Sequence, residues 1–187
     1  HQPMCDEPRR YWIVFNGETY NFKEIRVELE SLGYNFVSKT DTEVILKSYM
    51  QWGEKSLQKF NGDFAFAIYD NDKEEVFLAR DRIGIKPLYY TVQNDNFIFA
   101  SDIKTLIASK LYVPKVNMEG LYHNFSFSMA PRPMTSFQGV YALKQAHYMK
   151  IDCKTLTFDE IEYWDIPTQV QDLKMSENDA VNILEEE

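Results

Sequence analysis

Hydrophobic and polar residues along the first sixty positions follow the pattern of one strand and then two helices. Residues 11–15 are β-branched and aromatic, which predicts a strand that runs into the turn-forming pair Asn16-Gly17. Apolar residues recur at helical spacing over 22–32, after a potential capping residue, Asn21. Residues 40–43 form a capping box, and the apolar side chains after it predict a second helix.

The middle of the chain is typical of antiparallel sheet. Runs rich in β-branched and aromatic residues are separated by loops rich in Asp and Asn, which indicates hairpins. Hairpin-joined strands with helices before and after them favour an α+β fold over a doubly wound nucleotide-binding fold. The pattern predicts strands at 63–69, 75–79, 88–92, 97–100, 140–151 and 155–163, and helices at 102–109 and 118–125.

Composition narrows the class of protein. The chain has 187 residues, of which 44% are hydrophobic, so it can bury a real core and is not disordered throughout. No apolar run reaches the ~18 residues that a membrane span needs. Its two cysteines, Cys5 and Cys153, are too few for a disulfide framework, and free thiols suit a reducing compartment. We therefore expect a cytoplasmic protein.

The net charge of −9 is distributed unevenly. Residues 1–151 hold 18 acidic and 18 basic side chains, whereas residues 152–187 hold 11 acidic side chains against Lys154 and Lys174. Nucleic-acid and anionic-membrane binding rest on clustered Lys and Arg, so this balance argues against both kinds of partner. A capping box at 176–179 predicts the start of a helix within the acidic end.

Familiar catalytic motifs are absent from the sequence. It has no phosphate-binding glycine loop, no paired zinc-ligand motif and no nucleophile elbow. Its histidines, His1, His123 and His147, are scattered and have no Cys neighbours, so we expect no metal site. Cys5 lies among acidic residues that raise a thiol pKa, and Cys153 lies in a predicted turn, so neither is favoured as a nucleophile.

Three short segments carry candidate chemistry. A turn is the simpler interpretation of Asn16-Gly17, but a helix follows it, and an amide with a backbone N–H is suited to face a developing negative charge. Asp41 opens a helix, where an acid is either structural or a ligand for an ammonium group. Arg80 and Asp81 begin a charged loop that is either a solvated turn or an ionic network supporting a site.

Five segments in fixed order resemble the glutaminase domain of glutamine-hydrolysing asparagine synthetases. This domain is a class II glutamine amidotransferase of the N-terminal-nucleophile (Ntn) hydrolase superfamily. The resemblance is continuous over residues 1–109 and then weakens, and it implies an αββα sandwich of two stacked antiparallel sheets flanked by helices. The segments are FNGETYNF (15–22), TDTEVILKSYMQWGE (40–54), FNGDFAFAIYD (60–70), ARDRIGIKPLYY (79–90) and FASDIKTLIAS (99–109).

The resemblance implies a mechanism and roles for matched residues. In the family, an N-terminal Cys attacks the side-chain amide of glutamine and its own amine acts as general base. By resemblance, the Asn16 amide and the Gly17 N–H form the oxyanion hole. Glu18 and Asp41 then hold the α-amino group of the substrate. Ammonia passes to a synthetase domain that uses ATP and Mg²⁺ to convert aspartate into asparagine.

The same resemblance implies that the chain is part of a longer enzyme. The family's Cys-Gly start and the SGG-x-D-S loop of its synthetase domain are not in the sequence. We expect a partial amidotransferase domain in residues 1–150, with Arg80 and Asp81 supporting its site. Residues 151–187 are expected to form an acidic connector hairpin and the start of a helix leading to the synthetase domain. The polypeptide alone is expected to be inactive.

Two further expectations and two alternatives complete this interpretation. The family's N-terminal strand is expected to be missing, which exposes a sheet edge that a partner segment or a homodimer would cover. One alternative is the glutaminase part of another amide-forming amidotransferase, because the acceptor is chosen by the other domain. The other alternative is a non-catalytic module that binds an amino acid.

Overall fold

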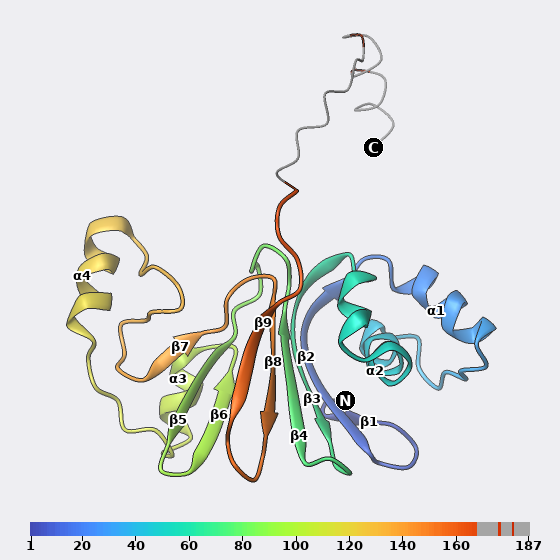
Figure 1. Cartoon of the computed structure of the whole chain (residues 1–187), viewed down its shortest axis with the longest axis horizontal. Helices are drawn as coiled ribbons and strands as arrows, with labels where there is room; N and C mark the ends of the chain where they lie inside the picture. Colours follow the sequence, from blue (N-terminus) through green and yellow to red (C-terminus); the bar gives the residue numbers. More distant parts are fainter. Residues whose placement is uncertain (168–175, 177–180, 182–187) are drawn as a thin grey trace.

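The computed structural model describes residues 1–167, 176 and 181. Two antiparallel sheets stand side by side at the centre of the described chain (Figure 1). The larger sheet has the order β1 (Met4–Cys5), β2 (Tyr11–Thr19), β3 (Gly62–Asp70), β4 (Glu75–Arg80), β8 (His147–Asp152) and β9 (Phe158–Glu162). The smaller sheet has the order β6 (Asn96–Ala100), β5 (Tyr89–Gln93) and β7 (Val140–Ala142).

Helices lie on both sides of the pair of sheets. The elements α1 (Phe22–Ser31) and α2 (Asp41–Trp52), with a 3₁₀ helix at Gly53–Gln58, lie outside the larger sheet, and α3 (Ile103–Ala108) and α4 (Met118–Phe127) lie on the far side (Figure 1). The predicted α+β architecture with two stacked antiparallel sheets is thus confirmed. None of the helices in the described ranges is long and apolar enough to cross a membrane.

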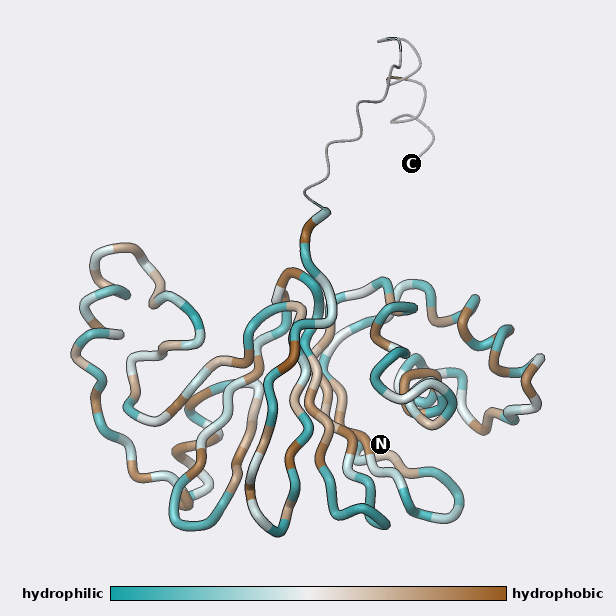
Figure 2. The backbone as a smooth tube through the Cα atoms, viewed as in Figure 1, coloured by the Kyte–Doolittle hydropathy of each residue, from teal (hydrophilic) through white to brown (hydrophobic). Residues whose placement is uncertain are grey.

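Strand β3 shows how the two layers are packed. Its side chains alternate between faces, as strand geometry requires. Phe64, Phe66 and Ile68 pack on the helix side, where the core also contains residues of α1 and α2. Ala65 and Ala67 face the second sheet and pack in a separate core cluster with residues of β5 and β8. Figure 2 shows the same distribution, with hydrophobic positions along the strands and hydrophilic positions in the connecting loops.

The predicted turn at Asn16-Gly17 is wrong. Strand β2 continues through both residues to Thr19 and pairs with β3 along its whole length. The Asn-Gly signal reports a local backbone preference, whereas the pairing with β3 is a long-range interaction that the local sequence does not contain. The candidate residues of this segment are therefore held on a strand in mid-sheet, not in a loop.

Other local predictions hold with small changes. Thr40 caps α2 as predicted, and the predicted strands of the first hundred residues are found, but the Asn21 side chain bonds to the backbone of Lys59 and Asn61 and does not cap α1. The predicted strand 140–151 is divided into β7 and β8, which belong to different sheets. The helix expected after the capping box at 176–179 falls mostly outside the described residues.

Candidate active site at the end of strand β2

Asn16 lies on the face of β2 that looks toward the second sheet. Its cross-strand partner on β3 is Ala65, whose partner on β4 is Arg80, so the three residues form a row on that face. The Asn16 amide nitrogen donates to Ser101 Oγ at 3.3 Å. Asn16 also lines a cavity of about 370 Å³ whose apolar wall includes Leu88. Its side chain is exposed, so its amide N–H groups are accessible from this cavity.

The direction of the Gly17 N–H follows from two contacts on the edge of β2 that faces away from β3. The Gln2 side chain bonds to this edge at Phe15, accepting from the backbone N–H at 2.7 Å and donating to the carbonyl at 2.9 Å. Two residues beyond Gly17, the Thr19 N–H donates to Asp41 Oδ2 at 3.2 Å. Alternate residues of a strand present their backbone groups to the same edge. The Gly17 N–H therefore points to the edge between two positions that side chains occupy.

Only glycine fits at position 17. Its φ is +151°, a conformation that other residues rarely adopt, and a Cβ there would lie 2.1 Å from the carbonyl oxygen of Asp63. This close approach keeps β2 and β3 paired while the backbone turns its N–H outward. Glycine is thus required by the strand pairing, whereas the sequence suggested that it was required by a turn.

Glu18 belongs to a small group of acids at the same end of β2. It is exposed, and its cross-strand partner is Asp63. Asp63 Oδ2 accepts a hydrogen bond from the Tyr20 hydroxyl at 2.7 Å, and this bond raises the pKa of Tyr20. Sequence reasoning missed both Asp63 and Tyr20, because only the register of β2 against β3 brings them to Glu18.

Asp41 reaches this end of β2 from the helix layer. It is the first residue of α2, and its carboxylate accepts from the Thr42 N–H at 2.8 Å as well as from the Thr19 N–H. None of the ion pairs among the described residues involves Glu18, Asp41 or Asp63. This end of β2 is therefore negative and is electrostatically suited to a bound cation.

Arg80 is fully buried at the end of β4. Its guanidinium donates to three carbonyl oxygens, of Lys86 at 2.7 Å, Gly84 at 2.7 Å and Leu143 at 2.6 Å. In return, the Arg80 carbonyl accepts from the Tyr163 hydroxyl at 2.8 Å. Arg80 thus connects the loop after β4 with residues that follow β7 and β9.

Asp81 is also fully buried, and its carboxylate is surrounded by main-chain donors. One of them is the N–H of Phe64, at 3.3 Å, and Phe64 is the cross-strand partner of Gly17. Neither Arg80 nor Asp81 lines the cavity beside Asn16. The support expected from them stays a prediction. The other donors are the backbone N–H groups of Ile83, Gly84, Ile85 and Lys86.

Neither cysteine lies at this site. Cys5 pairs with Trp12, four residues from Asn16 along β2, which is about 13 Å at ~3.3 Å per residue. Cys153 is in the turn after β8, where burial and then the carboxylate of Asp152 raise its pKa. The described residues contain no group of three or more His, Cys, Asp or Glu side chains arranged to hold a metal ion.

The chain is similar to known proteins over most of its length. Residues 1–164 match the profile of a family described as a glutamine amidotransferase domain. The chain is 43% identical over 134 residues to asparagine synthetase [glutamine-hydrolyzing] 1 of Bacillus subtilis, covering 72% of the chain and 21% of that protein. It is 36% identical over 160 residues to asparagine synthetase [glutamine-hydrolyzing] 3 of the same organism, covering 85% and 26%.

Solved structures share the fold. A glutamine phosphoribosylpyrophosphate amidotransferase from B. subtilis superimposes with a TM-score of 0.63 at 18% identity, over 88% of this chain and 32% of that protein. Identity this low supports likeness of fold alone. The chain spans about a fifth to a quarter of the length of the two relatives that it matches in sequence.

Proposed function

The chain belongs to the glutamine amidotransferase domain family and has the αββα fold of the Ntn hydrolases, and on that premise we propose that it forms part of the glutaminase site of an asparagine synthetase. One observation carries this proposal. Asn16 lines a cavity, Gly17 and Glu18 follow it on β2, and Asp41 is bonded to the same end of that strand. The proposed reaction releases ammonia from the side-chain amide of glutamine.

In this reaction, Asn16 and Gly17 stabilise a developing oxyanion. Attack of a thiolate on the amide carbon of glutamine moves negative charge onto the carbonyl oxygen, which then needs hydrogen-bond donors. The Asn16 amide donates one long hydrogen bond, to Ser101, and the side chain is exposed. A substrate oxygen can therefore compete for its N–H. The orientation of the Gly17 N–H toward the β2 edge supports its use as the second donor.

Glu18 and Asp41 bind the α-amino group of glutamine in this proposal. Carboxylates that have no partner cation attract an ammonium group, and Asp63 adds a third acid beside Glu18. Asp41 keeps its orientation through the N–H groups of Thr19 and Thr42. Binding of the amino group at this end explains a preference for glutamine over a plain amide.

The nucleophile is proposed to come from outside residues 1–187. The distance of Cys5 from Asn16 along the sheet, and the raised thiol pKa of Cys153, argue against both cysteines. We therefore expect the polypeptide of residues 1–187 to hydrolyse no glutamine by itself, and the longer protein that contains it to do so.

The remaining assignments concern the longer protein. Because the two relatives are named as asparagine synthetases, we propose aspartate as the acceptor and a synthetase domain as the partner that receives ammonia. ATP and Mg²⁺ are assigned to that domain and to no residue of this chain. A homodimer that covers an open sheet edge, and a cytoplasmic location that suits two free thiols, complete the proposal.

The test is ammonia release from glutamine by the full-length protein and by its Asn16→Ala variant. Loss of one oxyanion donor typically lowers kcat by about 10²- to 10³-fold, and we expect a decrease in that range. Asn71→Ala removes an amide of the same kind from the exposed turn after β3 and serves as the matched control. Wild-type turnover in the Asn16→Ala variant would contradict the proposed function.

A further inference from the structure

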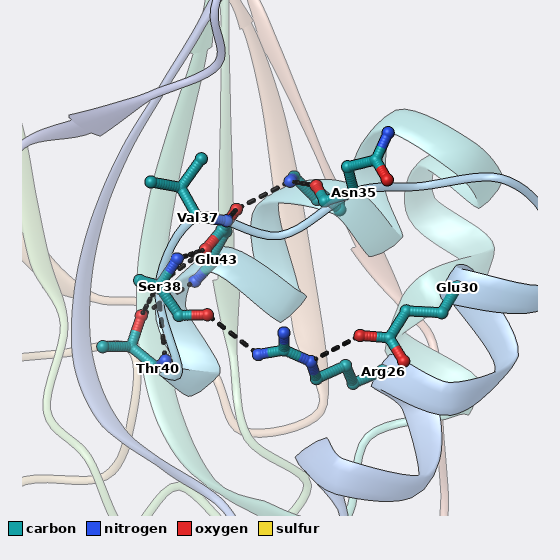
Figure 3. Close-up of polar contacts among 8 residues, drawn as sticks. Arg26, Glu30, Asn35, Val37, Ser38, Thr40 and Glu43 are labelled. Carbon is teal, nitrogen blue, oxygen red and sulfur yellow. Dashed lines mark hydrogen bonds and ion pairs between the residues drawn. The ribbon is translucent and has the colours of Figure 1, made fainter.

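A second polar cluster lies at the first turn of α2, around the buried residue Glu43 (Figure 3). Its centre is Glu43, whose side chain is only 7% exposed. The Glu43 carboxylate accepts from the backbone N–H groups of Val37 at 2.9 Å and Ser38 at 2.6 Å. It also accepts from the Ser38 hydroxyl and from Lys47 Nζ, both at 2.6 Å. One carboxylate thus fastens the loop before α2 to the helix itself.

Further contacts tighten this loop around Glu43. The hydroxyls of Ser38 and Thr40 are 2.9 Å apart, and Thr40 Oγ1 accepts from the Glu43 N–H at 3.4 Å as the helix cap. From α1, Arg26 donates to the Ser38 carbonyl at 2.8 Å and pairs with Glu30 at 2.8 Å (Figure 3). The loop is therefore held from the helices on both sides of it.

Glu43 stays ionised across the physiological range. Burial raises its pKa, but the hydrogen bonds from Lys47 and Ser38 and the backbone donors outweigh burial and lower the pKa to about 2. Charge-assisted bonds are shorter and about twice as strong as neutral ones, so the loop depends on this charge.

Thr40 and Asp41 connect this loop to the candidate site. Thr40 ends the loop and caps α2, and Asp41 is the next residue. Asp41 reaches across to the Thr19 N–H, whereas Glu43, two residues further on, turns back to the loop. The two carboxylates of one helical turn therefore hold α2 between the loop and strand β2.

We propose that Glu43 is a positioning residue, whose carboxylate holds residues 37–40 against α2 and so keeps Asp41 on the Thr19 N–H, where Asp41 binds the ammonium group of the substrate. The inference rests on the proposed function and deepens it, because it assigns part of the selectivity for an α-amino group to a residue that does not touch the substrate.

The effect is local, because α2 has a separate anchor. Val44, Ile45 and Leu46 are fully buried in the core on the helix side of the large sheet. Loss of the Glu43 charge leaves these contacts in place and releases the loop and the helix start. We therefore expect a shift of Asp41 rather than unfolding.

The test compares glutamine with glutaramate, which has the same amide and carboxylate but no α-amino group. In the full-length protein, Glu43→Gln is expected to lower the ratio of kcat/KM for glutamine over glutaramate about tenfold, below the ~10²-fold that a 1 Å misplacement can cause. The kcat/KM for glutaramate itself should stay within about twofold. Equal losses for both substrates would indicate a merely structural role and would overturn the inference.

A double-mutant cycle tests whether Glu43 acts through Asp41. Asp41→Asn alone should lower the preference for glutamine at least as much as Glu43→Gln does, although Glu18 remains. Adding Glu43→Gln to Asp41→Asn should lower it no further, because both variants act on the same contact, that of Asp41 with the ammonium group. Additive effects would overturn the inference. If Asp41→Asn left the preference for glutamine intact, the proposed role of Asp41 in binding the amino group would be wrong. This outcome is distinct from additive effects, which contradict only the role of Glu43.

Two further measurements extend the test. The first does not depend on turnover, and the second does not depend on the stability of Glu43→Gln. In Glu43→Gln, hydrogen exchange at the Thr19 amide should accelerate about tenfold, because its bond to Asp41 is weakened. Ser38→Ala removes the hydroxyl that contacts both the Glu43 carboxylate and Thr40, and it should change the substrate ratio in the same direction by about threefold. Glu30→Gln, which changes only the exposed partner of Arg26 on α1, is the control. Unchanged exchange, or a substrate ratio in Ser38→Ala that equals the ratio in this control, would overturn the inference.

Discussion

Two buried charge clusters flank the candidate site, and they use the same physical device in different surroundings. The cluster around Asp81 is fully buried at the end of β4, and none of the ion pairs among the described residues involves Asp81 or Arg80. The cluster around Glu43 lies at the rim of the helix layer, where Lys47 neutralises the carboxylate directly. In both clusters, a carboxylate holds a loop by its main-chain N–H groups.

The partners of each cluster show which one stabilises the fold and which one positions the site. Main-chain dipoles surround the charges of Arg80 and Asp81, and their bonds join segments that follow β4, β7 and β9. Removing either charge leaves several buried groups without partners. The bonds of Glu43 join one loop to one helix whose core contacts are independent of it. The first cluster therefore holds the tertiary structure, and the second sets a local position.

The largest expected effect is on the cluster that holds the fold. Arg80→Met removes the donors of three carbonyl groups, one in a buried and two in partly buried hydrogen bonds, and a buried group left unpaired costs ~1–3 kcal/mol. We expect the free energy of unfolding, measured with urea, to fall by roughly 3–5 kcal/mol. Arg9→Met, at an exposed position, is the matched control and should change it little. A loss below ~1 kcal/mol in Arg80→Met would show that the cluster is not needed for the fold.

The next largest loss of unfolding free energy is expected when the two carboxylates are replaced. Asp81→Asn and Glu43→Gln each replace a charged acceptor by an amide of the same shape. The Asp81 carboxylate accepts from five main-chain N–H groups and forms no ion pair with a described residue, so its variant should lose about 3 kcal/mol of unfolding free energy. For Glu43→Gln we expect about 1–2 kcal/mol. Equal losses in the urea experiment would contradict the division between fold and site.

The sequence predicts local features of these regions and misses those that depend on pairing. The cap at Thr40 can be predicted from the sequence because its partner, the Glu43 N–H, lies within one turn. The same motif predicts that the Glu43 side chain bonds back to the helix start, whereas it bonds to the N–H groups of Val37 and Ser38. Asp63 was missed because only the strand register brings it to Glu18. The Asn16-Gly17 turn was wrong because pairing with β3 overrides local preference.

The pH dependence of stability separates the clusters further, with a smaller effect. The folded-state pKa of Glu43 is about 2, below its ordinary value of 4.5, so the unfolded chain binds the proton more readily. The contribution of Glu43 to stability is present above pH 4.5 and is lost as the pH falls through 2. The urea midpoints of wild type and Glu43→Gln should therefore converge over that interval. If the difference between the two urea midpoints stayed constant over this pH interval, the lowered pKa of Glu43 would be contradicted.

The smallest expected effect lies at the outer end of the Glu43 cluster. Arg26 and Glu30 form an i,i+4 pair on α1, and the Glu30 side chain is 46% exposed. Such pairs contribute about 0.3–0.5 kcal/mol and weaken with salt. Glu30→Gln should lower the urea-derived stability by no more than this amount and should leave the bond of Arg26 to the Ser38 carbonyl intact. A larger loss, or a change in the glutamine-to-glutaramate ratio, would mean that the loop is held through Glu30 and Arg26 as much as through Glu43, and the assignment of its position to the Glu43 charge would then be wrong.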